Sequence, residues 1–374
     1  MRFVHTGDWQ MGLRAVQAQD RARQVRQARF DTARSIAAVA RRERADFVLL
    51  AGDTFEDHDV DEADVERTVE VLNRFAPIQV YVLPGNHDPL VPGGVWGRAS
   101  WRRVGGHVHL LERPEPLELP GGAVLYPCPL RQKQSRMDPT DWIPAREAGD
   151  SRIRLGLAHG SLRVLPQAEN FPIARDRAET AGLDYLALGD WHSYRVFGRT
   201  VYCGTPEQTA FDERDAGNVA VVELTDAGSM PQVRREAVEQ LRWEAFECRV
   251  EDPSDVQRLA EQLAAAGDPA RLLARVSCRV AATAPPEALE HLEGLRTRWG
   301  GEALLLRWEA EAPPRRLQSE ELPEGIFRQA AEDLAALAAG QTPQGPAAAM
   351  RDRDPAVLEA ARQLLSRLAE EVAR

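Results

Sequence analysis

The sequence lacks lysine almost entirely, and it lacks long apolar runs. Lys133 is the only lysine among 47 basic residues, and arginine is so abundant that no single arginine marks a binding site. No stretch approaches the roughly 18 uncharged apolar residues that span a bilayer, and polar residues follow Met1 within a few positions, so we expect neither a membrane span nor a signal peptide. The formal charge of −11 excludes a protein that coats nucleic acid through bulk positive charge, although it leaves room for a local basic groove.

Cysteine is scarce as well. The four cysteines have no paired spacing: Cys128, Cys203, Cys248 and Cys278. Scattered cysteines fit reduced thiols better than a disulfide framework, and they argue against a structural zinc ribbon. We therefore expect a cytoplasmic protein.

The first ninety or so residues alternate between strand-like and helix-like segments. Apolar runs that close on polar residues cover 2–8, 46–53 and 78–88, and segments with helical apolar spacing cover 15–45 and 60–76. This β-α-β-α-β order predicts parallel strands under helices, with polar loops at the carboxyl ends of the strands. From about residue 105, shorter apolar runs predict a second sheet packed on the first.

The pattern changes near residue 236, where strands and helices of a small α+β unit are expected. We predict three parts: residues 1–235, an α+β cap over 236–312, and a helical tail over 313–374. The tail contains a linker near 339–353, rich in Gly, Pro and Ala, before a terminal amphipathic helix.

Polar groups that can bind metal ions follow the apolar runs. In chain order they are Asp8, Gln10, Asp53, Asn86, His87, Asp88, His159, Asp190 and His192. One such residue alone is most often a turn residue or a satisfied core histidine. Oxygen and imidazole groups in this combination suit two hard or borderline divalent metals, as in two-metal hydrolases of phosphate esters.

The segments around these residues resemble the calcineurin-like metallophosphoesterase superfamily. LLAGD and LPGNHDP carry the strongest likeness, and the five motifs of the superfamily follow in order over residues 1 to about 205. VHTGDWQMG, ALGDWHSYR and VYCGTPEQTAFDE narrow the likeness to SbcD-type nuclease subunits of DNA double-strand-break repair. The resemblance implies an α/β fold, a four-layer α-β-β-α sandwich with a small α+β cap domain and C-terminal helices.

The resemblance also implies a role for each polar residue. The first metal ion would be held by Asp8, Gln10, Asp53 and His192, and the second by Asp53, Asn86, His159 and Asp190. His87 would protonate the leaving oxygen while Asp88 orients its ring. Mn is the expected metal, with Mg as the alternative, and Glu56, Trp191 and Arg195 are expected near the substrate.

Three of these positions depart from the superfamily or subfamily pattern. Gln10 replaces a histidine, Asp190 replaces the first histidine of Gly-His-x-His, and Glu56 lies where the nuclease subfamily has a histidine. A neutral amide is a weaker donor than imidazole, and a third carboxylate lowers the formal charge of a two-metal centre from about +2 to about +1. We therefore expect a first site that binds metal weakly and a second that prefers Mn or Mg over Zn.

The resemblance favours a DNA nuclease subunit that forms a homodimer and binds a coiled-coil SbcC-type ATPase through its C-terminal tail. Two alternatives remain open. A phosphodiesterase of cyclic nucleotides or other small phosphodiesters would share the site but need neither DNA nor a partner. A catalytically weakened structural or DNA-end-binding subunit would account for the three departures. Trp9 and Trp191 could stack on bases, although packing beside the metals explains them at least as well.

Overall fold

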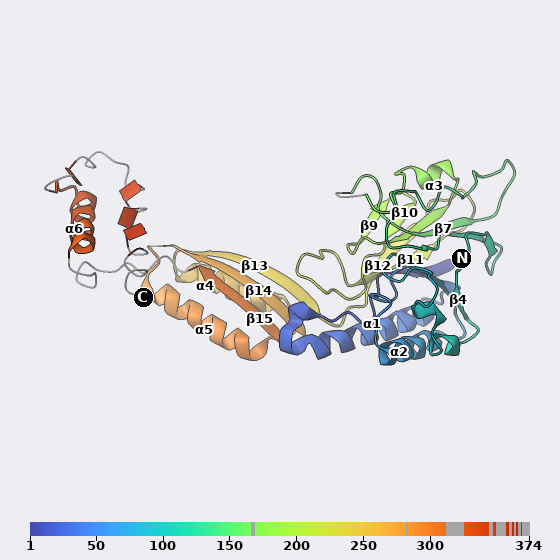
Figure 1. The fold of residues 1–374 in the computed structure, drawn as a ribbon, viewed down its shortest axis with the longest axis horizontal. Helices are drawn as coiled ribbons and strands as arrows, with labels where there is room; N and C mark the ends of the chain where they lie inside the picture. The colour runs from blue at the N-terminus through green and yellow to red at the C-terminus, as the bar shows by residue number, and fades with distance from the viewer. Residues whose placement is uncertain are drawn as a thin grey trace. The chain divides into compact units, whose positions relative to one another are not determined.

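A computed structural model of the chain describes residues 1–165, 169–281, 283–311, 325–343, 347–348 and isolated positions between 357 and 368. The chain divides into two compact units (Figure 1). The first comprises Met1–Glu244 with Ala270–Leu273, and the second comprises Ala245–Pro269 with Ala274–Arg374. Within these described ranges, no helix is both long enough and apolar enough to cross a membrane.

Six strands form the first sheet of the first unit, in the order β12-β11-β1-β2-β3-β4. The four strands β1 to β4 run parallel, and β11 and β12 continue the sheet in antiparallel pairing. Their bounds are β1 Arg2–Thr6, β2 Phe47–Ala51, β3 Gln79–Leu83, β4 Val108–Leu110, β11 Asn218–Glu223 and β12 Gln232–Ala237. Two helices, α1 Ala22–Arg42 and α2 Glu62–Asn73, cover one face of this sheet (Figure 1).

The second sheet has the order β5-β6-β7-β8-β10-β9, and β6, β7, β8 and β10 run parallel. Its bounds are β5 Leu117–Glu118, β6 Val124–Pro127, β7 Arg154–His159, β8 Tyr185–Gly189, β9 Arg195–Phe197 and β10 Thr200–Tyr202. A single helical turn, α3 Arg177–Thr180, packs with loops on the outer face. Short 3-10 helices also occur, η1 Val16–Arg21, η2 Val95–Gly97, η3 Trp101–Arg103 and η4 Pro269–Arg271.

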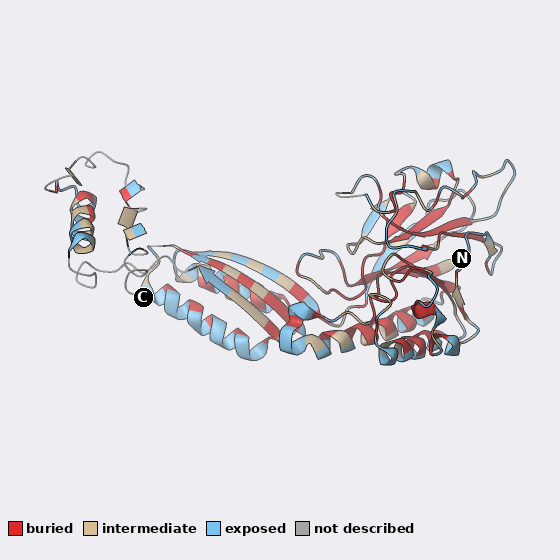
Figure 2. Ribbon diagram, viewed as in Figure 1, coloured by how far each residue is buried: buried red, intermediate tan, exposed pale blue. Residues whose placement is uncertain are grey.

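The two-residue alternation of the strands sorts their side chains between the layers. In β2, Phe47 and Leu49 join a core between the two sheets, whereas Val48 and Leu50 pack under α1 and α2. The central strands are therefore buried on both faces (Figure 2). Helices, two sheets and an outer layer give the predicted four-layer α-β-β-α sandwich, and the fold prediction is confirmed.

In the part of the chain that the structure describes, the second unit contains most of a three-stranded sheet and three helices. Its strands β13 Arg242–Val250, β14 Leu272–Val280 and β15 Leu305–Glu311 lie in the order β13-β14-β15, with α4 Pro253–Ala265, α5 Pro286–Glu302 and α6 Ile326–Ala338. The residue before α4 is Asp252, whose carboxylate accepts the Ser254 N–H in a capping box. The division at 235 and 312 stays a prediction, because residues 312–324 lie outside the described ranges, as do most of the linker and terminal helix.

Candidate metal centre

The candidate metal centre lies where the parallel strands of both sheets end. β1, β2, β7 and β8 end at or just before Asp8, Asp53, His159 and Asp190, respectively. The backbone turns sharply there, because Asp8, Gln10, Asp53 and Asp190 have positive φ angles of 52°, 46°, 49° and 94°. Non-glycine residues adopt this conformation uncommonly, and a cluster of four such residues at one place is a feature that active sites share.

His159 is the central imidazole of the cluster. Asp8, Asp53 and His159 are buried, and each offers a ligand atom within 4.8 Å of the others. The Nδ1–H of His159 donates to the Ala51 carbonyl (2.8 Å), which leaves Nε2 at 2.6 Å from Asn86 Oδ1 and 3.3 Å from Asp53 Oδ2. Neighbouring ligands of a small divalent ion lie about 3 Å apart, since metal–oxygen distances are about 2.1 Å.

Asp190 completes this oxygen-rich set. Its backbone N–H donates to Asp8 Oδ1 (3.1 Å), and one carboxylate oxygen lies 3.9 Å from His159 Nε2. The hydroxyl of Ser161 donates to the other carboxylate oxygen. Carboxylates, an amide oxygen and one imidazole fit a hard divalent ion such as Mn²⁺ or Mg²⁺, so the residues present fit a metal at this position.

Burial and charge set the protonation of this cluster. Burial raises the pKa of Asp8 to about 6. Burial alone would lower the pKa of His159, but the carboxylates of Asp53, Asp8 and Asp190 outweigh it and hold that pKa well above the ordinary value. A proton therefore occupies the cluster when no cation does.

Gln10 and His192 form a second group beside this cluster. Burial alone would lower the pKa of His192, but the carboxylates of Glu213, Asp8 and Asp53 raise it to about 9. The amide nitrogen of Gln10 lies 3.2 Å from His192 Nε2, and its Oε1 accepts from Arg29 Nη2 (3.4 Å). His192 Nδ1–H donates to Glu213 Oε1 (2.6 Å), and Glu213 also accepts the backbone N–H of Thr209 (2.6 Å). Both ends of the Gln10 amide thus contact protein groups.

His87 lies beside the cluster and is held by backbone groups. Its N–H donates to Asp53 Oδ1 (2.9 Å), and its ring Nδ1–H donates to the Glu56 carbonyl (2.8 Å). The sequence suggested that Asp88 orients this ring, but the structure places the Asp88 carboxylate elsewhere. This carboxylate accepts the N–H groups of Gly85 (2.7 Å) and Phe55 (3.0 Å), and so braces the loops that carry Asp53 and His87.

Residues 1–194 match the sequence profile of the calcineurin-like phosphoesterase family. The chain belongs to this family. The uncharacterized metallophosphoesterase YhaO of Bacillus subtilis (strain 168) is 26% identical over 219 residues, which cover 54% of this chain and 51% of YhaO. The chain therefore aligns with about half the length of that relative. Among solved structures, TT1561 of Thermus thermophilus aligns with 64% of this chain and 99% of its own, at 11% identity and a TM-score of 0.41.

Three glycines of the phosphoesterase motifs admit no side chain. A Cβ added to Gly52 would lie 2.2 Å from His159 Nδ1, and one added to Gly85 would lie 2.1 Å from Asp53 Oδ1. At Gly189 the added atom would lie 2.0 Å from the Ala51 carbonyl oxygen. Gly52 and Gly189 therefore let the two sheets bring their ligand-bearing ends together, and Gly85 lets two neighbouring loops of the first sheet approach each other.

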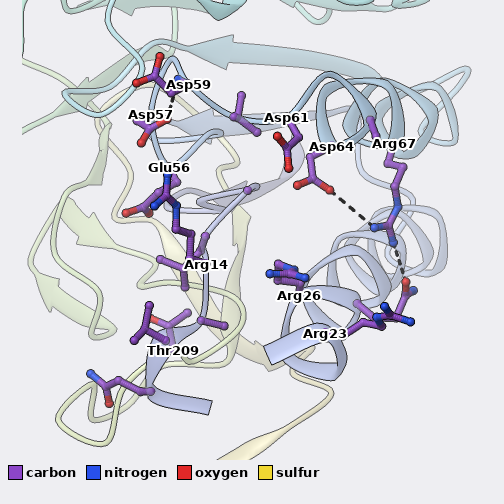
Figure 3. Close-up of a pocket in the computed structure, with 18 of the residues that line it drawn as sticks. Arg14, Arg23, Arg26, Glu56, Asp57, Asp59, Asp61, Asp64, Arg67 and Thr209 are labelled. Carbon is purple, nitrogen blue, oxygen red and sulfur yellow. Dashed lines mark hydrogen bonds and ion pairs between the residues drawn. The ribbon is translucent and has the colours of Figure 1, made fainter. Parts of the chain in front are cut away.

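A charged groove of about 840 Å³ adjoins the phosphoesterase site (Figure 3). Glu56 and Thr209 line this groove. The Glu56 carbonyl accepts a hydrogen bond from the His87 ring, and the Thr209 hydroxyl donates to Glu213, so the groove reaches the neighbours of the metal centre. Figure 3 shows arginines and acids around the same space; the labelled ones are Arg14, Arg23, Arg26, Arg67, Glu56, Asp57, Asp59, Asp61 and Asp64. The groove is large enough for a ligand of nucleotide size.

The remaining candidate substrate residues have different surroundings. Trp9 is buried, donates to Thr6 Oγ1 (2.9 Å) and stacks on Phe75, so the packing interpretation is correct for this residue. Trp191 is half-buried against the core outside the second sheet, and Arg195 is exposed at the start of β9. Their roles stay predictions.

Arg29, Glu213 and Ser161 touch the site, but the sequence did not reveal them. A signal existed for Arg29, because it lies in line with Val25 and Thr32 on the apolar face of α1. A charged residue on such a face needs a buried partner. Glu213 and Ser161 lie in loops, where no periodicity reveals them.

Proposed function

We propose that this chain is a divalent-metal-dependent phosphodiesterase that cleaves DNA. The observation that carries the proposal is the buried convergence of Asp8, Asp53 and His159 next to His87. Mn is the proposed metal, and Asn86 and Asp190 are the further proposed ligands. A bound divalent ion would supply Lewis acidity toward a phosphate ester and lower the pKa of water.

His87 is the proposed acid of this reaction. The Glu56 carbonyl holds Nδ1–H, and Asp53 holds the backbone N–H, so the opposite ring nitrogen, Nε2, remains for the substrate. A proton on Nε2 can pass to the leaving oxygen, and general acid catalysis of this kind contributes typically about 10²–10⁴-fold. Asp88 supports the loop that carries this histidine.

The arginine side of the groove supports DNA as the substrate. Arg14 and Arg23 line it and form no ion pair with any residue that the structure describes, so their charges are available to phosphates, whereas Arg26 also interacts with Asp64 across the groove (Figure 3). The opposite side supports a second candidate, a small phosphodiester. Asp57, Asp59 and Asp61 would repel a long polyanion more than a compact substrate.

Digestion of linear duplex and single-stranded DNA with added Mn tests the proposal, with bis(p-nitrophenyl) phosphate as the small diester. We expect wild type to cleave DNA and His87→Ala to lose at least about a hundredfold of that rate. His291→Ala is the matched control, because His291 is exposed on α5. Cleavage of the small diester without cleavage of DNA would favour the second candidate. No cleavage of either would favour a structural subunit.

The homodimer and the coiled-coil ATPase partner remain part of this proposal. The exposed apolar residues Ile326 and Leu364 lie in the C-terminal region proposed for the partner. Light scattering of the purified chain, alone and mixed with a candidate ATPase, would measure both associations.

A further inference from the structure

Arg29 is a buried cation next to the metal centre, and the proposed hydrolytic reaction assigns it no role. Arg29 as a whole residue is 3% exposed, and Nε donates to the Trp9 carbonyl (3.0 Å) while Nη1 donates to the Glu207 carbonyl (3.3 Å). The third contact is the bond from Nη2 to Gln10 Oε1. Two of these three contacts hold the turn that carries Asp8 and Gln10.

The contact with Arg29 fixes the orientation of the Gln10 amide. A guanidinium has only N–H donors, so the group that faces it must be the oxygen of the amide and not the NH₂. The NH₂ group consequently faces His192. An amide nitrogen cannot bind a metal ion, and the oxygen that could is bound to a cation.

Both ring nitrogens of His192 also contact protein groups. Glu213 fixes the ring through Nδ1, and the nitrogen that remains, Nε2, faces the Gln10 amide at 3.2 Å. Arg29, Gln10, His192 and Glu213 thus form a continuous hydrogen-bonded chain through the place where the family resemblance puts the first metal ion. His159 differs, because its Nε2 faces the oxygens of Asn86 and Asp53.

We propose that Arg29 takes the place of the first metal ion, so that each chain binds a single divalent ion through Asp8, Asp53, Asn86, His159 and Asp190. The guanidinium provides positive charge beside Asp8, and Gln10 and His192 serve as hydrogen-bonding groups rather than as ligands. This assignment revises the two-ion expectation from the sequence. It specifies the metal content of the proposed phosphodiesterase and holds whichever phosphodiester is the substrate.

Arg29 has the electrostatic surroundings that this role requires. Burial lowers the pKa of Arg29, and the carboxylates of Glu213, Glu207, Glu56 and Asp8 oppose that shift. A guanidinium remains charged under such conditions. A second divalent ion at Gln10 would share an oxygen with this cation and be repelled by it.

Metal stoichiometry tests the proposal without any substrate. The purified full chain is titrated with MnCl₂ by calorimetry, then dialysed and analysed for Mn, and its electron paramagnetic resonance spectrum is recorded. We expect one ion per wild-type chain and the six-line spectrum of an isolated Mn²⁺. Asp53→Asn should lose that ion. Two ions with a spin-coupled spectrum in wild type would overturn the proposal, whatever the result of the cleavage assay.

The variants separate the contributions of Gln10 and Arg29. Gln10→His alone should still bind one ion, because Arg29 remains in place. Gln10→His combined with Arg29→Gln should bind two. The matched control combines Gln10→His with Arg41→Gln, since Arg41 is exposed on the same helix, and should bind one. Two ions in Gln10→His, or one in a folded Gln10→His/Arg29→Gln protein, would refute the role of Arg29. If the double variant does not fold, the wild-type stoichiometry and spectrum decide.

Discussion

Replacing Gly52 by alanine should distort the metal centre through a single added carbon. Gly52 has a φ of 90°, and the new Cβ would lie 2.2 Å from His159 Nδ1, so the imidazole must move. Left-handed backbone costs an alanine about 1–2 kcal/mol. Loss of the bond from His159 to the Ala51 carbonyl leaves buried groups unpaired, which costs about 1–3 kcal/mol more. We expect a total loss of about 2–5 kcal/mol in the free energy of unfolding.

Gly149→Ala is a matched control for the backbone contribution. Gly149 has nearly the same φ, 88°, but an added Cβ there meets no atom within 4 Å. The control should therefore lose only about 1–2 kcal/mol. The difference between the two variants isolates the displacement of His159 from the strain of the backbone.

Urea unfolding of both metal-free variants measures the stability difference, and Mn titration measures the effect on the site. A displaced ligand should weaken Mn binding by about 10–100-fold in Gly52→Ala and leave it unchanged in Gly149→Ala. Equal stability losses together with equal Mn affinities would refute the inference that Gly52 is needed for His159 to reach its position.

Two further predictions concern protons. Mn binding should release a proton from His159, because the carboxylates of Asp53, Asp8 and Asp190 raise its pKa despite the opposite effect of burial. Mn affinity should therefore rise with pH, and calorimetric heats should vary with the ionisation enthalpy of the buffer; heats independent of the buffer would contradict this. Burial raises the pKa of Glu207 to about 7, although the hydroxyl of Thr32 and two backbone N–H groups donate to it. Between its usual pKa of 4.5 and about 7, the folded state holds a proton that the unfolded state has lost, so stability should fall by about 3 kcal/mol as the pH rises through this window. Glu207→Gln should lack this slope in urea unfolding at pH 5 and pH 8, and identical slopes would show that another group titrates.

Local periodicity was sufficient to predict the main layers of the fold. The continuous apolar run Phe47–Ala51 reflects burial on both faces of the sheet, and the helical spacing in Ala22–Arg42 reflects burial on one face. The sequence did not reveal β5, β9 or β12. β5 and β9 have only two or three residues, and β12 has one apolar face position, Val233, among charged neighbours. Edge strands such as these pair with a sheet that is already present, so their own residues need little apolar character.

The candidate ligands were predictable because each follows a strand, and strand ends converge in a parallel sheet. The geometry of individual side chains was not. Asp88 was expected at the His87 ring, but it caps the N–H groups of Gly85 and Phe55. Nothing in the sequence indicated that Arg29 would reach Gln10, since the contact joins a helix to a turn that precedes it by 19 positions. Such pairings depend on the packing of α1, which no local pattern encodes.

The left-handed residues of the metal centre also affect how this protein could evolve. Aspartate tolerates that conformation better than most residues, whereas Gln10 is not among the types that favour it. A glycine at position 10 would relieve about 1 kcal/mol of backbone strain. It would also leave the buried Arg29 Nη2 and His192 without the amide that contacts them, at a cost of about 1–3 kcal/mol. The strained backbone at position 10 is therefore retained by the buried contacts of the side chain, and selection for stability alone would not remove Gln10.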